Sequence, residues 1–366
     1  MVCLCDEEYT SQTCGKCGQV HHQLGENKTF WQTTEKTGAL LVIVVPNHCE
    51  KHQMRTSFQL LVILILCAVS CSIGQRRRHG LGLSSLDIDL GICPNKVVVA
   101  QTLPDEFDAR DRWPECISGI FDQGSCGSCW AVTTSQLLTD RFCISTNATV
   151  RKLLSPQQQI NCDQSCKWCD GGYLDQALAY LSKEGTVSDS CNNYVAKQQT
   201  CSDYTCDSGA EASIIFYADG CHKLSGETAM MNEIYANGPI LAGFTIYENF
   251  VEYEGGVYDT VSGLAEGGHA VRIIGWGEDA GKPYWLCANS WGTSWGVNGY
   301  FKFLRGSDLC GIESNVVATT PDVDQLMEDS EGVDNNSLRD PAEEYFNPSS
   351  GAILLSPLAV LVGFLL

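Results

Sequence analysis

Basic residues are scarce in this chain, which has 23 lysines and arginines against 44 aspartates and glutamates and a formal net charge of −21. Proteins that bind nucleic acid need clustered lysine and arginine to neutralise phosphates. We therefore expect no nucleic-acid partner. The length of 366 residues allows two or three domains.

Hydrophobic runs long enough to cross a membrane, which requires about 20 residues, are also lacking. The apolar run at 58–69 has 12 residues, follows Met54-Arg55 and ends in small residues up to Ser72. This pattern predicts a secretory signal peptide at 54–72. Because signal peptides act at the N-terminus, we interpret Met54 as the true start and 1–53 as a gene-model artefact; the alternative is an internal signal-anchor.

The C-terminal apolar run, 351–366, has 16 residues and no basic residue after it. Between Asp322 and Glu344, nine acidic residues accompany one basic residue, so 320–350 is expected to be a disordered acidic tether. Small residues at 335–337, a polar spacer and the apolar tail fit a GPI-attachment signal, for which Ser349-Ser350 is the alternative site. A short transmembrane anchor and a removed tail are the alternatives. We therefore expect a membrane tether through the C-terminus, without assigning its type.

A second pair of metal ligands is missing near the N-terminus. The segment 8–18 resembles the zinc ribbon of one family of insertion-sequence transposases, with Cys14 and Cys17 at metal-binding spacing. Tetrahedral zinc needs four ligands, and His48 and Cys49 are poor substitutes for the missing pair. No metal is expected.

Histidine is rare from Leu103 onward, where only His222 and His269 occur. The most informative segment precedes them: residues 123–130 read Gln-Gly-Ser-Cys-Gly-Ser-Cys-Trp. Cys129 begins an apolar-periodic run that predicts a helix. The N-terminus of a helix favours an anion and lowers the pKa of a thiol, which is reactive only as thiolate.

Four further residues complete the chemistry of acyl transfer by a thiol. His269 follows two glycines in an alternating, strand-like segment and is the candidate base. Asn289 can orient the imidazole through its side-chain oxygen, and Trp291 can shield that hydrogen bond from water. The Gln123 amide, with the Cys129 backbone N–H, can bind the oxyanion.

These motifs resemble the papain family of cysteine proteases, whose local signature contains Cys-Gly-Ser-Cys-Trp with histidine and asparagine about 130–150 residues downstream. The resemblance covers 103–319 and is closest to the cathepsin B branch, through stretches such as Leu103–Arg110, Cys169–Tyr173 and Leu304–Ser314. It implies an α+β papain-like fold, with a helical lobe and a β-barrel-like lobe separated by the active-site cleft.

The resemblance also assigns roles. Cys129 would be the nucleophile, His269 the base, Asn289 its orienter and Gln123 the oxyanion donor of a cysteine-type endopeptidase. Gly172, Gly268, Trp291 and Asn315 would contact substrate. Disulfides are implied between Cys116 and Cys143 and between Cys126 and Cys169, with Cys310 unpaired. Expected partners are protein and peptide substrates and cystatin-type inhibitors; no cofactor is required and a monomer is expected.

The pattern along the chain agrees with two lobes. Helices are predicted from Cys129, from Ser155-Pro156, over 172–184 and over 227–236. Alternating strands are then predicted at 239–247, 269–276, 284–288 and 300–304. The preceding segment, 73–102, is expected to be a short propeptide containing the basic triplet Arg76–Arg78.

Two departures from the cathepsin B pattern bear on specificity. That enzyme trims dipeptides from C-termini with paired histidines on an inserted loop, but no histidine lies between Cys191 and Cys221 here. We therefore expect an endopeptidase with little carboxydipeptidase activity. Asn315 replaces an acidic residue in the second specificity pocket, which predicts apolar or aromatic preference.

A catalytically inactive binding protein on the same fold is the alternative, although Cys129 argues against it. Thirteen cysteines lie from Leu103 onward, and setting Cys129 aside leaves an even number, twelve, compatible with disulfides. Together with the signal peptide, they predict the secretory pathway, with a lysosomal, vacuolar or extracellular destination. The sequon at Asn147 predicts a surface glycosylation site.

Overall fold

The structure is a computed structural model. The chain forms two compact units, Met1–Arg76 and Arg77–Leu366. The described residues are 23–24, 27–33, 40–45, 80–82, 92–97, 100–209, 212, 214–330 and 335–340. In the first unit, β1 (Gln23–Leu24), β2 (Asn27–Thr33) and β3 (Leu40–Val45) form an antiparallel three-stranded sheet. The half zinc ribbon, signal peptide, basic triplet and C-terminal apolar tail lie outside the described residues.

The second unit is built on one eight-stranded sheet with the order β5-β11-β6-β8-β9-β10-β7, in which β4 also pairs with β8. All neighbouring strands are antiparallel except β10 and β7. The bounds are β4 Phe107–Asp108, β5 Ala218–Lys223, β6 Ile240–Tyr247, β7 Val257–Tyr258, β8 Ala265–Asp279, β9 Lys282–Ala288, β10 Tyr300–Leu304 and β11 Val316–Pro321.

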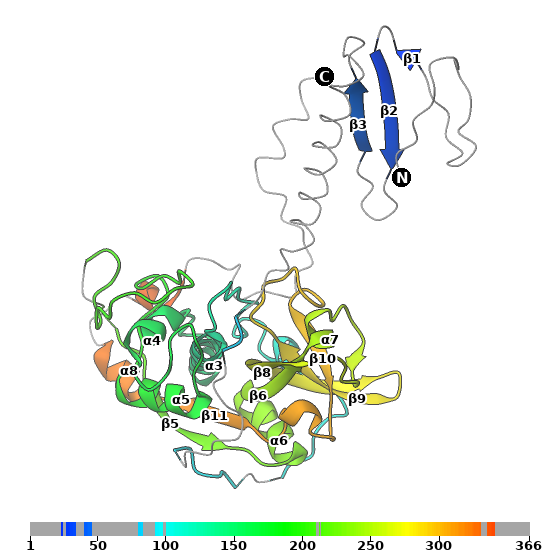
Figure 1. Cartoon of the computed structure of the whole chain (residues 1–366). Helices are drawn as coiled ribbons and strands as arrows, with labels where there is room; N and C mark the ends of the chain where they lie inside the picture. Colours follow the sequence, from blue (N-terminus) through cyan, green and yellow to red (C-terminus); the bar gives the residue numbers. More distant parts are fainter. Residues whose placement is uncertain are drawn as a thin grey trace, which may run out of the picture. The chain divides into compact units, whose positions relative to one another are not determined.

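The helices gather mainly on one side of this unit, as Figure 1 shows for α3, α4, α5 and α8. Their bounds are α2 Ala109–Arg112, α3 Cys129–Ser145, α4 Pro156–Cys162, α5 Leu174–Lys183, α6 Glu227–Asn237, α7 Glu248–Val251 and α8 Val323–Asp329, with 3₁₀ turns η1 Leu309–Gly311 and η2 Asn335–Leu338. On the other side lie β8, β9, β10 and α7. The expected two-lobed α+β arrangement is present.

Local sequence explains where the helices begin and end. The Ser155 hydroxyl caps α4 by accepting the Gln158 N–H at 3.1 Å, and Pro156 occupies the first helical position. The leucine and alanine face of α5 is buried, and Gly185, with φ +71°, follows its end. In contrast, α3 is buried on all sides from Cys129 to Cys143, which makes it the central helix of its lobe.

Because successive side chains of a strand point to opposite faces of the sheet, one sheet contributes to the hydrophobic cores of both lobes. On β6, Leu241 packs into the core of the helical lobe, whereas its neighbours Ile240 and Ala242 pack into an aromatic core. That second core contains Phe244, Phe250, Trp291, Trp295, Phe301 and Phe303. The sheet thereby fixes the helical lobe against the β-rich lobe, with α3 packed beside β8 and β11.

Five disulfides occur in the described residues, and both pairs implied by the resemblance are among them. The five are Cys93–Cys221, Cys116–Cys143, Cys126–Cys169, Cys162–Cys201 and Cys191–Cys206. Cys129, Cys166, Cys287 and Cys310 are not disulfide-bonded.

The segment predicted to be a propeptide is divided between two places. Residues 80–82 lie against Cys129 and Gly172, whereas Cys93 is bonded to β5 and Lys96 pairs with Lys223 through the backbone. The short propeptide predicted at 73–102 stays a prediction; within it, Cys93 has its bonding partner in the sheet of the second unit.

The acidic segment after β11 is also more ordered than expected. Asp322 caps α8 by accepting the Gln325 N–H at 3.0 Å, and Leu326 of this helix is fully buried. Further along, Asp340 forms an ion pair with Lys152 at 2.9 Å and Leu338 is buried. The expectation of a disordered tether is therefore wrong for 322–330 and 335–340, where a few apolar residues anchor an acidic stretch.

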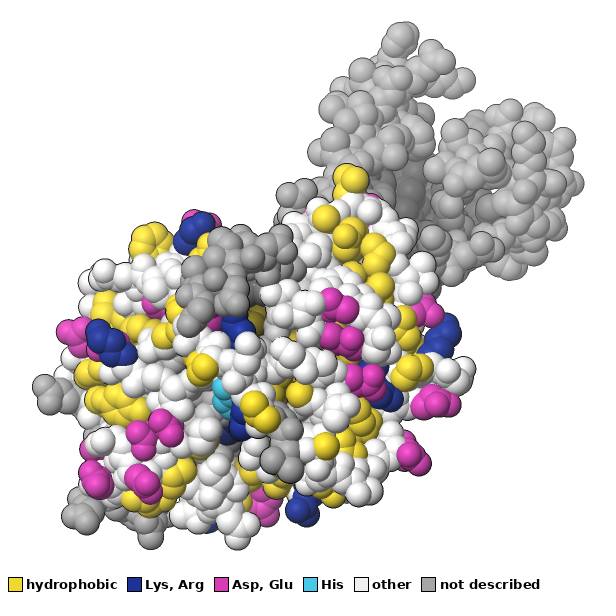
Figure 2. All heavy atoms as spheres, turned by 90° about the horizontal axis from the view of Figure 1, so that it is seen from below, with side chains coloured by type: hydrophobic (Ala, Val, Ile, Leu, Met, Phe, Trp, Pro, Cys, Tyr) yellow, Lys and Arg dark blue, Asp and Glu magenta, His cyan; other side chains and the backbone are white. Residues whose placement is uncertain are grey.

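On the face drawn in Figure 2, acidic side chains are spread in small groups and the basic ones occur in isolated positions. No continuous basic patch is visible among the described residues on this face. Within the described part of the chain, no helix has the length and apolarity to span a membrane, and no cluster of metal-ligating side chains is found.

Candidate active site

Cys129 is the first residue of α3, directly after the N-cap residue Ser128. Its side chain is fully buried, and the sulfur accepts the backbone N–H of Ala270 on β8 at 3.4 Å. Folding therefore brings the helix that begins at 129 to the strand that contains His269, the immediate neighbour of Ala270. The central helix and the central strand meet at the thiol.

His269 and Asn289 form a buried hydrogen bond of 2.7 Å between Nε2 and Oδ1. Because an amide oxygen can only accept, Nε2 carries the hydrogen. Oδ1 also accepts the Ser290 N–H at 2.8 Å, which fixes the orientation of the amide. The remaining ring nitrogen, Nδ1, is then the one that can exchange a proton with a thiol.

Trp291 covers this hydrogen bond. Its ring centroid is 4.8 Å from that of His269, and its side chain is only 1% exposed. Trp291 therefore has the shielding position expected of it. It is packed in the aromatic core, and the contact with substrate that the resemblance implied stays a prediction.

The side chain of Gln123 is held between two sets of partners. Its Oε1 accepts the Ser290 hydroxyl at 2.5 Å, while Nε2 donates to the carbonyl oxygens of Cys126 and Gly80 at 2.9 and 2.6 Å. The Ser290 hydroxyl thus orients the Gln123 amide, and the amide N–H points at the carbonyl oxygen of Gly80 in the upstream segment. This is the geometry of a donor for a carbonyl or an oxyanion.

The segment Gly80–Gly82 lies along this site. The Gly172 N–H donates to the Gly82 carbonyl at 2.7 Å, and the Gly80 N–H donates to the Gly124 carbonyl at 3.4 Å. A Cβ added to Gly82 would be 2.9 Å from the Cys129 sulfur. The segment therefore covers the thiol and uses Gly172 as a backbone partner, the role predicted for that glycine toward substrate.

Covering the thiol changes its acidity. Burial raises the pKa of Cys129 to about 12, although N–H groups of Ala270 and Gly82 act in the opposite direction. In this covered form the thiol is protonated at neutral pH and is a poor nucleophile.

The two remaining residues predicted to contact substrate are Gly268 and Asn315. Gly268 pairs with Thr245 inside the sheet, whereas the preceding residue, Gly267, lies so close to Leu81 that an added Cβ would be 3.2 Å from that side chain. Asn315 lies directly before β11, and its amide donates to the Gly311 carbonyl at 3.4 Å. The nearby Glu313 carboxylate accepts the Trp285 indole N–H at 2.8 Å and is engaged in the fold.

Sequence reasoning missed two contributors. Ser290 orients Gln123, and its position between Asn289 and Trp291 was an available signal. Tyr194 also reaches the site, with its hydroxyl 2.6 Å from the Ser128 hydroxyl and donating to the Gln123 carbonyl at 2.8 Å. Nothing in the local sequence around Tyr194 indicates this, because the contact spans 71 positions.

A thiol at the start of a buried helix, beside a histidine–asparagine pair and an oriented amide, defines the cysteine peptidases as a class. Residues 103–320 match the model of the papain family cysteine proteases. The chain belongs to this family.

Individual relatives agree with this. The chain is 41% identical to a gut-specific cysteine proteinase of Caenorhabditis elegans over 246 residues, covering 60% of this chain and 74% of that protein. It is 40% identical to cathepsin B-like cysteine proteinase 4 of the same organism over 259 residues, covering 61% and 76%. Among solved structures, proCathepsin B S9 from Trypanosoma congolense superposes with a TM-score of 0.62 and 32% identity, covering 66% and 87%.

Proposed function

We propose that this cysteine peptidase is an endopeptidase in which Cys129 is the nucleophile and His269 the general acid and base. The observation that carries this proposal is the contact of the Cys129 sulfur with the backbone beside His269, at the N-terminus of α3. Removal of the covering segment returns the thiol to solvent and lowers its pKa, because burial is the main cause of the rise.

The proposed reaction uses groups from four residues. The thiolate of Cys129 bonds to the peptide carbonyl carbon, and the resulting oxyanion accepts hydrogen bonds from the Gln123 amide and the Cys129 backbone N–H. The His269 imidazolium then protonates the leaving amine as the C–N bond breaks. Water, deprotonated by His269, hydrolyses the thioester and releases the acid and the thiol. Asn289 keeps the imidazole oriented throughout.

The path of a substrate is supported by the chain that already lies in the site. Gly172 and Gln123 bind carbonyl oxygens of Gly82 and Gly80 at 2.7 and 2.6 Å. We infer that an extended peptide uses the same backbone partners, with Gly267 or Gly268 on the opposite side. Cystatin-type inhibitors are proposed to compete for this track.

Endopeptidase specificity is proposed because the segment between Cys191 and Cys221 lacks the paired histidines that would bind a substrate C-terminus. The described part of the segment between Cys191 and Cys221 contains no histidine. His222 lies in β5 and contacts Glu233 at 3.2 Å, which gives it a structural role. Cleavage of internally quenched peptides should be unaffected by amidation of the C-terminus. Sequential dipeptide removal from free C-termini would contradict this proposal.

A preference for apolar or aromatic residues is proposed for the second specificity pocket. Asn315 offers an amide where a carboxylate would be needed to pair with arginine. A peptide library should therefore select against arginine at this position, and Asn315→Glu should gain arginine cleavage. Strong arginine selection by the unaltered chain would contradict the assignment.

Covalent labelling by an epoxysuccinyl inhibitor separates an active peptidase from an inactive binding protein. The labelling is done after residues 80–82, which cover the thiol, are removed. Labelling should be lost in Cys129→Ala and retained in Cys310→Ala, whose substituted cysteine is partly exposed and also free. An unaltered chain that neither labels nor cleaves peptides would support the inactive alternative.

Export through the secretory pathway is also proposed, supported by five disulfides among the described residues, since such bonds persist in oxidising compartments. A membrane tether through the C-terminus and a monomeric state are further parts of this proposal. Release of the protein from cells by a phosphatidylinositol-specific phospholipase would identify a GPI anchor.

A further inference from the structure

The loop between Cys191 and Cys206 contributes one side chain to the site. The Tyr194 hydroxyl donates to the backbone carbonyl of Gln123 at 2.8 Å and lies 2.6 Å from the Ser128 hydroxyl. A phenol has one hydrogen, so a bond to the Gln123 carbonyl leaves the Tyr194 oxygen to accept from Ser128. One side chain thus connects the residue that precedes Cys129 with the backbone of Gln123.

The tyrosine is itself held in place. Its ring meets Phe121 edge to face, with centroids 4.9 Å apart, and it packs beside Cys126, Trp130 and Ala131. Burial raises the pKa of Tyr194 to about 12, so the hydroxyl stays protonated at the pH of peptide hydrolysis. The Gln123 backbone is fixed on its other side by a 2.9 Å bond from its N–H to the Ser290 carbonyl.

We propose that Tyr194 is a positioning residue that sets the distance between the Gln123 amide and the Cys129 backbone N–H. This inference rests on the proposed roles of those two residues. Both oxyanion donors must point at one oxygen atom, and the Ser128–Tyr194–Gln123 connection joins the two chain segments that carry them. The connection is present while residues 80–82 cover the thiol, so the two oxyanion donors are already positioned before substrate binds.

Tyr194→Phe tests this, because it keeps the ring and removes only the hydroxyl. We expect kcat to fall about tenfold with KM unchanged, a fraction of the loss seen when an oxyanion donor itself is removed. Alkylation of Cys129 by iodoacetamide should keep its rate, since that reaction develops no oxyanion. Tyr204→Phe is the matched control, because the Tyr204 hydroxyl binds the Glu184 carbonyl at 2.7 Å in the same region of the chain.

An unchanged kcat in Tyr194→Phe would overturn the proposal, as would an equal fall in kcat and in the alkylation rate, which would indicate displacement of Cys129. Failure of the proposed function looks different, because the unaltered enzyme would then show no peptidase activity.

A second and independent observation concerns residues 92–97. Cys93 is 3% exposed and is bonded to Cys221 of β5, 128 positions away. The backbone then pairs in parallel with β5: the Lys223 N–H donates to the Pro94 carbonyl at 2.8 Å, and the Lys96 N–H donates to the Lys223 carbonyl at 3.0 Å. Since β5 is at the end of the sheet, this segment covers a sheet edge.

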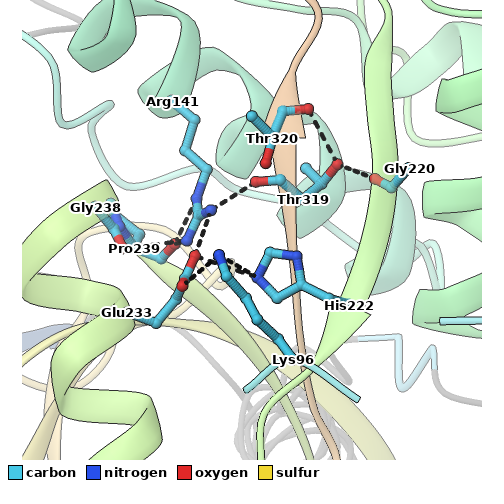
Figure 3. A network of polar contacts seen from close by, with 9 residues as sticks. All are labelled: Lys96, Arg141, Gly220, His222, Glu233, Gly238, Pro239, Thr319 and Thr320. Atoms are coloured by element: carbon cyan, nitrogen blue, oxygen red, sulfur yellow. Dashed lines mark hydrogen bonds and ion pairs between the residues drawn. The ribbon is translucent and has the colours of Figure 1, made fainter. Parts of the chain in front are cut away.

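The side chain of Lys96 enters a polar network with residues from both lobes (Figure 3). The Glu233 carboxylate, 1% exposed, binds Lys96 and Arg141, each at 2.9 Å, and contacts His222 at 3.2 Å. Arg141 also donates to the Pro239 carbonyl at 2.8 Å. Burial alone would raise the pKa of Glu233, but the His222 hydrogen bond and the Arg141 charge outweigh it and keep this carboxyl ionised.

The two parts of the predicted propeptide are therefore attached very differently. Residues 80–82 are held in the site by backbone hydrogen bonds, which peptide substrates can replace. Residues 92–97 are held by a covalent bond, a strand pairing and an ion pair to a buried carboxylate.

The structure assigns residues 92–97 to the mature enzyme: we propose that they remain attached as a permanent edge strand when residues 80–82 leave the site. A chain cut before Cys93 keeps them as its N-terminus. A chain cut closer to Leu103 keeps them as a second chain joined through Cys93 and Cys221.

Mass spectrometry of the full-length chain after activation tests this without reduction of disulfides. We expect the active enzyme to contain a peptide with Cys93 linked to a peptide with Cys221. Active enzyme that lacks residues 92–97 would overturn the proposal.

Variants give a second readout of the same proposal. In the activated enzyme, Cys93→Ser with Cys221→Ser should lower Tm by about 5–10 °C, and Lys96→Met should lower it less. Cys310→Ser is the control, because Cys310 is not disulfide-bonded. If the double variant fails to fold, Lys96→Met carries the test; a Tm of the activated enzyme unaffected by either change would contradict a permanent strand.

Discussion

The Gln123 side-chain amide donates a 2.6 Å hydrogen bond to the carbonyl oxygen of Gly80. The donor proposed to hold the oxyanion therefore binds a carbonyl of the chain's own upstream segment. Leu81 and Gly82 continue past the thiol, and Gly172 binds the Gly82 carbonyl. The track proposed for substrate is therefore occupied by the chain's own residues 80–82.

Glycine at position 82 is required for this occupation. A Cβ there would lie 2.3 Å from the Gly127 carbonyl oxygen and 2.9 Å from the Cys129 sulfur. Gly82→Ala should therefore weaken the covering segment and raise the peptidase activity of the unprocessed chain by about tenfold, because overpacking costs about 1–3 kcal/mol. Initial rates on a fluorogenic peptide measure this. Once residues 80–82 are removed, both proteins should have equal activity; an unprocessed variant as inactive as the unaltered chain would refute the prediction.

The covered thiol should also be recognisable from its pH dependence. A pKa of about 12 means that the thiolate fraction of Cys129 falls tenfold for each pH unit below that value. In the unprocessed chain, the rate of iodoacetamide alkylation should rise steadily from pH 5 to pH 9 without a plateau. The processed enzyme should reach its plateau at a lower pH. Labelling of Cys129→Ala corrects for the other free cysteines, and a plateau below pH 8 in the unprocessed chain would contradict the prediction.

Local patterns located most of the regular structure. The strand expected at 300–304 has those bounds, and the helix expected at 227–236 ends one residue later. The strand expected at 269–276 is longer, Ala265–Asp279, because Gly267 and Gly268 continue the pairing with β6. Periodicity and caps act over a few residues, so they are readable from the sequence.

Long-range contacts were not readable in this way. The Cys93–Cys221 bond and the Tyr194–Gln123 contact join positions 128 and 71 apart. The acidic composition after β11 concealed α8, because two apolar residues, the buried Leu326 and the partly buried Val323, are enough to anchor an acidic helix. In each case the decisive partner lies in another element, which composition and spacing do not specify.

The two lobes are joined by a buried ion pair that should be needed for stability. Arg272 on β8 binds Asp140 on α3, and neither side chain is more than 1% exposed. Asp140→Ala should reduce the free energy of unfolding by about 3–5 kcal/mol, since it leaves a buried charge without its partner. Urea denaturation measures this loss.

The matched control is Asp259→Ala, which removes the exposed pair with Lys282 and should cost about 0–1 kcal/mol. Replacing both buried partners, by Asp140→Leu with Arg272→Met, should recover much of the stability. A single Asp140→Ala variant as stable as the control would show that the pair does not hold the lobes together.

Asp189 provides a pH-dependent test of the contact between the helical lobe and the acidic segment. Burial, with the charges of Asp340 and Asp207, raises the pKa of Asp189 to about 6. The pKa of Asp189 in the unfolded chain is about 3.9. Above pH 6 the ionised carboxylate therefore lowers the free energy of unfolding, and protonation removes this loss as the pH falls. Asp189→Asn should therefore add roughly 2–3 kcal/mol to the free energy of unfolding at pH 7.5 and almost nothing below pH 4. Urea denaturation at the two pH values measures the difference, with the exposed Asp219→Asn as control; an equal gain at both pH values would mean that the carboxylate charge is not the cause.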